Sequence, residues 1–347
     1  MKTIRINVSS ASYDIKLGKD VIYNLPSYLK EIGFFGKLII ITDTNVEKYH
    51  LNTLEEILKK DNIEYSVVII PAGEEYKTLE TVNYIYNELC KTGVTRKDTI
   101  LAFGGGVTGD ISGFVSATYL RGIKYIQVPT TLLSQVDSSI GGKTGVDLES
   151  GKNLVGAFKQ PELVVADTSL LSTLDDIQIS SGMAEIIKAG FIKDKELVSK
   201  LLCSENFNED LEEFIIRAIN VKKEVVEKDE FEKHERMLLN FGHTFGHSIE
   251  KYYDFKGITH GQAVAIGMCL ITKNEEVKEK LVHALEKYNL KTTTDIPMAA
   301  IIDLCKNDKK ALKDSINIVT VEEIGNGIIK NYSFDKLGEI YGWYKTF

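Results

Sequence analysis

The sequence predicts an α/β protein with two domains: an N-terminal domain built on a mostly parallel sheet, over residues 1–175, and a mainly α-helical domain over residues 176–347. In the first half, short apolar runs alternate with helical patterns, as expected of parallel strands that helices cover on both faces. After about residue 175, helical periodicity replaces this alternation. A length of 347 residues also exceeds that of most single domains.

The expected strands of the N-terminal domain are short and apolar. They span residues 3–8, 37–42, 65–70, 99–103, 125–128 and 163–166. Between them lie segments such as residues 78–92, where Val82, Ile85 and Leu89 recur at helical spacing. This order of strand and helix predicts that the strands run largely parallel.

Helices are expected along most of the C-terminal domain. They span residues 180–191, 209–227, 238–252, 261–272, 277–288 and 297–306. In the second of these, Phe214, Ala218 and Val225 belong to one apolar stripe, with charged residues on the other side. A β-hairpin is expected near the end, with strands at residues 316–321 and 327–332.

Composition excludes several classes of protein. Hydrophobic residues make up 43% and charged residues 27%, which is the balance of a folded soluble protein and not of a disordered chain. A formal net charge of −8 argues against nucleic acid or an anionic membrane as a partner. No apolar run could span a bilayer, no secretory signal is recognisable, and the four cysteines form no C-x-x-C pair. We therefore expect a cytoplasmic protein with reduced thiols.

A glycine-rich loop at residues 104–110 predicts a dinucleotide site in a Rossmann-like domain. The loop follows an expected strand, opens an expected helix over residues 110–119 and satisfies G-x-G-x-x-G, so that backbone N–H groups could approach a pyrophosphate. The acid that usually binds the ribose is missing, because no Asp or Glu lies between Asp110 and Asp137. Asp43, which follows an earlier strand, is the candidate replacement. The alternative is a plain glycine turn.

Residues 127–145 and 151–156 are rich in hydroxyls and glycines and predict an anion-binding region. A P-loop is excluded, because the glycine that the motif requires five residues before Gly142 is missing. What remains is a set of backbone N–H groups with Lys143, Lys152 and Asn153. The alternative is a polar loop with solvated lysines.

Three histidines lie close together in the sequence and predict a metal site. His243 and His247 are four residues apart on one face of an expected helix, and His260 precedes the next helix. Imidazoles and a carboxylate suit zinc, and Glu185, in an otherwise apolar helix start, is the candidate carboxylate. The spacing does not decide between His243/His247 and His243/His260 as the ligand pair. The alternative is that the histidines are packing residues.

Taken together, these motifs resemble the 3-dehydroquinate synthase family of the sugar phosphate cyclase superfamily. The matching segments follow the family's order, at residues 73–77, 104–110, 119–122, 129–131, 137–144, 151–158, 183–188, 236–250, 260–268 and 308–310. The resemblance implies an NAD-binding α/β domain, a helical metal- and substrate-binding domain, and a homodimer. Gln262 departs from the family's pattern, since many members have Glu after His-Gly, and this could alter the tuning of the metal.

The activity that the resemblance implies belongs to the shikimate pathway. The substrate is 3-deoxy-D-arabino-heptulosonate 7-phosphate, which is cyclised to 3-dehydroquinate with loss of phosphate. NAD oxidises C5 transiently, phosphate leaves by β-elimination, the same NADH returns the hydride, and an intramolecular aldol step closes the ring after it has opened. NAD is therefore catalytic, and one divalent metal, Zn²⁺ or Co²⁺, assists.

The resemblance also assigns residues. The metal ligands are Glu185, His243 and His260, which leaves His247 for substrate and proton chemistry. The NAD residues are Asp43, Asn45, Glu74, Lys77, Gly104, Gly105, Gly106, Val107, Thr108, Gly109, Asp110, Thr130, Thr131, Lys143, Lys152, Leu170 and Thr173. Phosphate is assigned to Arg121, Lys143, Asn153 and the Lys309/Lys310 pair, whose members are not distinguished, and the carboxylate to Lys222 and Arg236. The catalytic set is Asp137, Lys143, Lys152, Asn153, Lys188, Glu232, Arg236, Asn240 and His247.

The alternative functions differ in whether they require cationic side chains to bind an anionic substrate. A metal-dependent polyol dehydrogenase of the glycerol type has no use for so rich an anion-binding set, and a cyclase making 2-deoxy-scyllo-inosose acts on a substrate without a carboxylate. A non-catalytic NAD-sensing protein needs no metal triad.

Arg236 could share a helical face with Asn240 and His243 if the helix begins early enough. The alternative is an exposed ion pair with Glu232, worth only ~0.3–0.5 kcal/mol.

Overall fold

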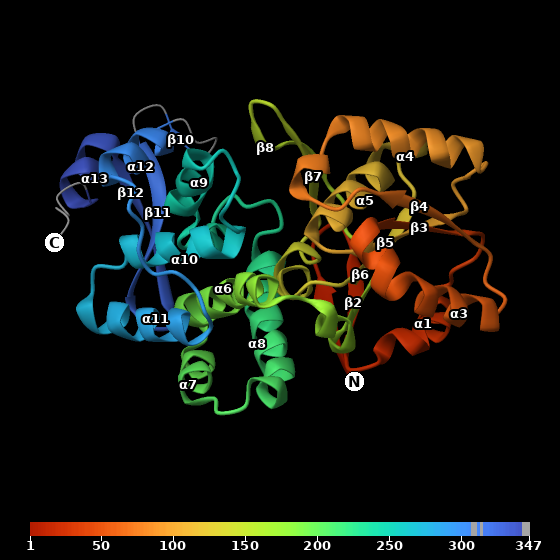
Figure 1. The fold of residues 1–347 in the computed structure, drawn as a ribbon, viewed down its shortest axis with the longest axis horizontal. Helices are drawn as coiled ribbons and strands as arrows, with labels where there is room; N and C mark the ends of the chain where they lie inside the picture. The colour runs from red at the N-terminus through yellow and green to blue at the C-terminus, as the bar shows by residue number, and fades with distance from the viewer. Residues whose placement is uncertain (307–310, 313–314, 342–347) are drawn as a thin grey trace. The chain divides into compact units, whose positions relative to one another are not determined.

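The computed structural model describes residues 1–306, 311–312 and 315–341. Lys309 and Lys310, predicted to bind phosphate, lie outside these ranges. The chain divides into two compact units, unit 1 (Met1–Leu174) and unit 2 (Asp175–Phe347), which are described in turn (Figure 1). Within the described residues, no helix combines the length and the apolarity needed to cross a membrane.

Unit 1 is built on a seven-stranded sheet with the strand order β1-β2-β9-β6-β5-β3-β4. The strands are β1 (Lys2–Asn7), β2 (Ser12–Gly18), β3 (Leu38–Asp43), β4 (Tyr65–Ile70), β5 (Thr99–Gly104), β6 (Lys124–Pro129) and β9 (Leu163–Asp167). In this fully described unit, β1 pairs antiparallel with β2 and the other neighbours in the sheet pair in parallel. The prediction of a mostly parallel sheet is confirmed. Strand β2 was not predicted, because Asp14 and Lys16 interrupt its apolar residues.

Helices cover both faces of this sheet (Figure 1). They are α1 (Leu25–Glu31), α2 (Thr44–Val46), α3 (Asn52–Lys60), α4 (Leu79–Lys91) and α5 (Gly106–Thr118). Because side chains alternate along a strand, Ile40 packs in one core cluster with Leu54 of α3, while Ile41 packs in the other with Val82 of α4 and Val115 of α5. Burial on both faces explains why β3 and β5 are apolar almost throughout.

The strand order reverses between β3 and β5. The chain leaves β3 for the edge strand β4, returns to β5 on the other side of β3, and then adds β6 and β9 beyond β5. Ligands of open α/β sheets bind beyond the carboxyl ends of the strands at such a reversal. Asp43 ends β3, and the glycine loop follows β5, so both lie at this point of the sheet.

The region predicted from its composition to bind anions contains a hairpin. Strands β7 (Lys143–Leu148) and β8 (Gly151–Phe158) pair antiparallel. Val146 is buried in the core cluster that contains α5, and Val155 packs against the same cluster. Their apolar alternation was hidden among glycines and hydroxyls, which is why the hairpin was not predicted.

Unit 2 is mainly helical, as predicted. Its helices are α6 (Asp176–Lys193), α7 (Lys195–Cys203), α8 (Phe207–Lys228), α9 (His243–Tyr252), α10 (His260–Ile271), α11 (Glu275–Lys287), α12 (Met298–Cys305) and α13 (Phe334–Tyr341). Strands β10 (Ala311–Leu312), β11 (Ser315–Glu323) and β12 (Asn326–Ser333) form an antiparallel sheet, which contains the predicted hairpin. Helices α7 and α13 were not predicted.

One predicted helix begins later than expected. Residues Glu235–Asn240 form a 3-10 helix, η7, and Gly242 then adopts a φ of 80°, so α9 starts only at His243. A left-handed residue cannot continue a right-handed helix. The idea that Arg236, Asn240 and His243 share one helical face is therefore wrong.

Candidate metal centre and cofactor site

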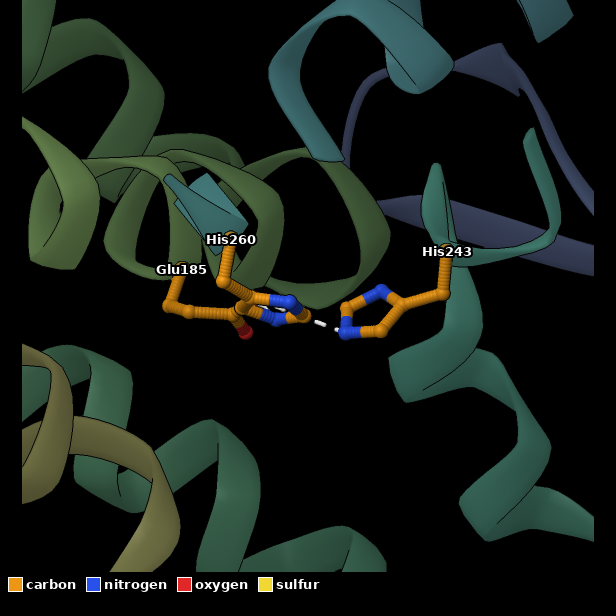
Figure 2. A group of neighbouring side chains, drawn as sticks. All are labelled: Glu185, His243 and His260. Carbon is orange, nitrogen blue, oxygen red and sulfur yellow. Dashed lines mark ion pairs between the residues drawn. The ribbon is translucent and has the colours of Figure 1, made fainter. Parts of the chain in front are cut away.

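Three helices of unit 2 bring Glu185, His243 and His260 together. Glu185 lies in the middle of α6, whereas His243 and His260 are the first residues of α9 and α10. The Nε2 atoms of His243 and His260 lie 3.6 and 3.7 Å from Oε1 of Glu185 (Figure 2). One ligand atom from each residue falls within 4.8 Å of the other two. The three side chains that the resemblance assigned to a metal thus form one cluster.

Glycines allow the helices to approach this closely. A Cβ on Gly261 would overlap with the backbone of Ser181 in α6, and one on Gly267 would overlap with the carbonyl oxygen of Gly242. Helix α10 therefore packs directly against the backbone of its neighbours, with His260 held at its first turn. Gln262 completes a capping box with Thr259, a role that Gln and Glu share, so its departure from the family's pattern is explained by helix capping.

The cluster has the chemistry of a metal site. The carbonyl oxygen of Phe241 lies 3.3 Å from Nδ1 of His243, which must donate to it and so keeps a lone pair on Nε2. Burial disfavours a charge on His260, but Glu185 and Glu250 outweigh this and raise the pKa of His260 to about 10. The surroundings thus favour a cation, and a metal ion can take the place of the proton. Two imidazoles and one carboxylate suit Zn²⁺ or Co²⁺.

Other polar side chains, buried or partly buried, lie next to the cluster. Lys188, one turn after Glu185, contacts the second oxygen of its carboxylate. The ring of His247 lies 5.4 Å from that of His243 and 6.1 Å from that of His260, so it borders the cluster. Glu250 approaches His260 from another side, with Oε2 3.6 Å from Nδ1. Glu250 was not expected here from the sequence, although its spacing of seven residues from His243 could have indicated it.

The cations expected to bind a carboxylate are buried. Lys222 in α8 is 7% exposed and Arg236 in η7 is 2% exposed. The Arg236 guanidinium donates to the carbonyl of Glu230, and Asn240 donates to the carboxylate of Glu232 over 2.7 Å. Burial of Arg236 excludes the exposed surface ion pair that was the alternative.

In unit 1, Asp43 and the glycine loop meet. The hydroxyl of Thr108 in the first turn of α5 donates to Oδ2 of Asp43 over 3.1 Å. The other oxygen, Oδ1, accepts from the backbone N–H groups of Asn45 and Val46. The backbone N–H of Thr130 donates to the carbonyl of Gly104, which ties the end of β6 to the loop. The structure therefore gathers Asp43, the glycines and Thr130 at the reversal of the sheet.

Lys77 connects this loop to the β7–β8 hairpin. Its Nζ lies 2.6 Å from Oδ2 of Asp110 and donates to Oδ1 of Asn153 over 2.6 Å. Burial would lower the pKa of Lys77, but Asp110 and Glu74 outweigh it and raise the pKa, so the lysine stays charged. Burial also raises the pKa of Asp110, and the close Lys77 ammonium opposes that effect and favours an ionised pair. Lys152 lies 3.5 Å from Glu74.

Asp147 holds the turn of the hairpin. Its Oδ1 accepts the backbone N–H of Asn153 over 2.6 Å, and its own N–H donates to the carbonyl of Lys77 over 2.8 Å. Asn153 has a φ of 53°, a left-handed conformation that needs such support. Asp147 was not expected at the site from the sequence, because the contact is made across the hairpin turn.

The remaining predicted residues are spread over unit 1. Thr173 ends a 3-10 helix that starts at Thr168, and its hydroxyl lies 2.8 Å from Nε2 of His50, while Leu170 of the same segment is buried. Asp137 lies in a π-helical turn after β6. Arg121 and Lys143 are exposed.

Together, these features define a class of two-unit protein: a parallel sheet with a dinucleotide-type loop at its reversal, followed by a helical unit with a metal-type cluster. The chain belongs to the 3-dehydroquinate synthase family, because the family's N-terminal sequence model matches residues 67–181 and its C-terminal model matches residues 182–311. A 3-dehydroquinate synthase from Clostridium kluyveri is 44% identical, over 99% of this chain and 98% of the relative. The predicted family is therefore confirmed.

Solved structures of cyclases share the whole fold. A 2-deoxy-scyllo-inosose synthase complexed with carbaglucose-6-phosphate, NAD⁺ and Co²⁺ superimposes with a TM-score of 0.85 at 28% identity, covering 98% of this chain and 99% of that one. A 2-epi-5-epi-valiolone synthase from Streptomyces hygroscopicus, with NAD⁺ and Zn²⁺ bound, gives a TM-score of 0.83 at 26% identity, with 96% of each chain covered. The predicted fold class is confirmed.

Proposed function

We propose that this protein converts 3-deoxy-D-arabino-heptulosonate 7-phosphate into 3-dehydroquinate and phosphate, the reaction that gives its family its name. Relatives over nearly the full length support this. The observation that carries the proposal is the combination, in unit 2, of a metal-type cluster with the buried cations Lys188, Lys222 and Arg236. Cationic side chains of this kind can bind anionic groups, and the substrate carries both a carboxylate and a phosphate. A polyol offers neither.

The cofactors are NAD and one divalent metal ion. When bound, NAD takes a hydride from the substrate and later returns it, and the metal polarises the hydroxyl that is oxidised. Glu185, His243 and His260 would hold the metal. The residues that would hold NAD include Asp43, Gly104, Gly105, Gly106, Thr108, Asp110, Thr130 and Thr131, with Asn45, Glu74, Lys77, Val107, Gly109, Lys143, Lys152, Leu170 and Thr173 as the remaining candidates.

We assign the substrate's two anionic groups to different residues. The planar fork of Arg236 and the ammonium of Lys222 would bind the carboxylate, since a guanidinium matches a carboxylate in geometry. Arg121, Lys143, Asn153 and one of the pair Lys309/Lys310 would bind the phosphate. Fixing both ends of the substrate would orient its reacting carbons and hold the reactive intermediate in place.

Proton transfers are assigned to residues that would border the substrate hydroxyls. His247 is the candidate for proton transfer, because an imidazole can both donate and accept a proton and the ring lies beside the metal-type cluster. Asp137, Lys152, Lys188, Glu232 and Asn240 would also lie near the substrate hydroxyls. Beyond its small-molecule substrate, we expect a second copy of the same chain as a partner, in a cytoplasmic homodimer.

A comparison of substrates tests the proposal. The purified protein, supplied with NAD⁺ and Zn²⁺, should release phosphate from the heptulosonate phosphate and not from a sugar phosphate that lacks the carboxylate. It should not oxidise glycerol. Phosphate release from the sugar phosphate alone would favour another cyclase, and steady reduction of NAD⁺ by glycerol would favour a polyol dehydrogenase.

A further inference from the structure

Glu250 is a buried carboxylate for which the proposed function has no use. It lies in the last part of α9 and is 3% exposed. A carboxylate removed from water costs free energy unless a donor or a cation compensates for it. One group that faces it is the ring of His260, whose Nδ1 lies 3.6 Å from Oε2 of Glu250. This contact indicates that Glu250 acts on the orientation or protonation of the His260 ring.

His260 stands between two carboxylates, one at each ring nitrogen. Glu185 faces Nε2 at 3.7 Å, the side on which His243 also lies, and Glu250 faces Nδ1. The lone-pair directions of the two nitrogens of an imidazole diverge, so an ion bound at Nε2 between Glu185 and His243 is directed away from Glu250. Glu250 is thus placed to act on the ligand and not on the ion.

The contact determines which nitrogen is left to bind metal. A carboxylate accepts hydrogen bonds, so at Nδ1 it favours the tautomer that carries its proton there and a lone pair on Nε2. Carboxylates that accept from the outer nitrogen of a metal-bound histidine also fix the orientation of the ring and raise its basicity. The Phe241 carbonyl, a neutral acceptor, lies at Nδ1 of His243 and favours the same tautomer there.

The architecture of α9 supports this role. His243 and Glu250 are seven residues apart, about two helical turns, and therefore lie on one face. Gly246 lies between them, and a Cβ there would come within 3.1 Å of the Ala263 carbonyl, so α10 approaches the helix at this face. One helix thus supplies a ligand and also the group that orients the ligand of the next helix.

We propose that Glu250 is a positioning residue of the metal centre, which holds His260 with Nε2 directed at the ion. This inference rests on the proposed function, because it requires a metal at Glu185, His243 and His260. A second arrangement is conceivable from the same geometry, since His247, Glu250 and His260 also offer ligand atoms within 4.8 Å of one another. The experiment has to separate orientation from direct ligation.

The test measures metal binding without relying on catalysis. Metal-free wild type, Glu250→Gln, Glu250→Ala and the exposed control Glu279→Ala are titrated with Zn²⁺ against a chromogenic chelator, and the visible spectrum of each Co²⁺ form is recorded. We expect one ion per chain in all four, with affinity about 10- to 100-fold weaker for Glu250→Ala and an altered Co²⁺ spectrum. Glu250→Gln should fall between, because its amide oxygen can face Nδ1 as an acceptor but carries no charge. Glu279→Ala should match the wild type.

Two outcomes would overturn the inference. Unchanged affinity and spectrum in both Glu250 variants would leave Glu250 without a role at the metal. Two ions in the wild type and one in Glu250→Ala would make it a ligand in the group with His247. If the alanine variant fails to fold, the near-isosteric Glu250→Gln carries the decision. Failure of the proposed function would look different, as a wild type that binds no metal or releases no phosphate.

Discussion

The candidate sites of the two units consist mainly of different chemical groups: backbone groups in unit 1 and charged side chains in unit 2. In unit 1, strand ends and backbone groups converge at the reversal of the sheet, and carboxylates such as those of Asp43 and Asp147 accept from neighbouring backbone, beside the largely buried ion pair Lys77–Asp110. In unit 2, several charged side chains are buried, with Glu185, Lys188 and Arg236 at most 3% exposed and Lys188 in contact with Glu185. Removing one member of a buried charged group leaves another uncompensated. Substitutions in unit 2 should therefore cost more than substitutions in unit 1.

The largest effect is expected at the metal ligands. His243→Ala and His260→Ala should lose the ion and lower kcat/KM by about a thousandfold or more, because Lewis-acid assistance contributes several kcal/mol. His247→Ala should retain the ion, although its activity falls. Metal content after dialysis, compared with activity, checks this. A His247→Ala protein without metal beside a His260→Ala protein with metal would reverse the ligand assignment.

Close packing in unit 2 gives the next largest effect. Gly261→Ala places a methyl group against the Ser181 backbone, so we expect a loss of about 1–3 kcal/mol in the free energy of unfolding and weaker metal binding. Gly338→Ala in α13 is the matched control, since no atom of the described residues lies within 4 Å of its Cβ position and alanine favours a helix. Denaturant unfolding of both variants provides the comparison. Equal stabilities would show that α10 and α6 can separate at no cost.

Arg236 tests whether a buried cation in unit 2 recognises the substrate. Arg236→Lys should lower kcat/KM by about tenfold or more, equivalent to about 1.4 kcal/mol, because lysine lacks the fork that binds a carboxylate in two places. Metal and NAD binding should not change. Arg217→Lys is the control, since Arg217 in α8 forms ion pairs with Asp194 and Glu196. Equal kinetics for Arg236→Lys and wild type would remove the strongest argument for a keto acid substrate.

The smallest effect is expected in unit 1. Asp147→Ala removes the acceptor for the backbone N–H of Asn153, so stability should fall by about 1 kcal/mol and KM should rise more than kcat falls. Asp147→Asn keeps an acceptor and should lie close to the wild type. Thermal unfolding and steady-state kinetics measure both quantities. A loss in Asp147→Ala as large as that at the metal ligands would contradict the contrast drawn between the units.

The same contrast explains what the sequence could predict. Strands β1, β3, β4, β5, β6 and β9 of unit 1 and the glycine loop were predictable, because short apolar runs and a local motif determine them. The metal triad was recognised through the family resemblance, since spacing alone left His247 and His260 as equal candidates. Glu250 and Asp147 were not predicted from the sequence, because their roles depend on contacts with His260 and Asn153 across turns of the chain. The position at which α9 begins was not predicted either, because it is determined by a single residue, Gly242, in a left-handed conformation.

The most direct test of the account is the amount of NADH that accumulates for each phosphate released. The purified protein is incubated with the heptulosonate phosphate, Zn²⁺ and NAD⁺ at a concentration well below that of the substrate, and phosphate and NADH absorbance are followed together. If one site removes and returns the hydride, phosphate release should continue through many turnovers per NAD⁺ with no growing NADH absorbance. One NADH accumulated per phosphate, with the reaction stopping once NAD⁺ is spent, would contradict the proposed function.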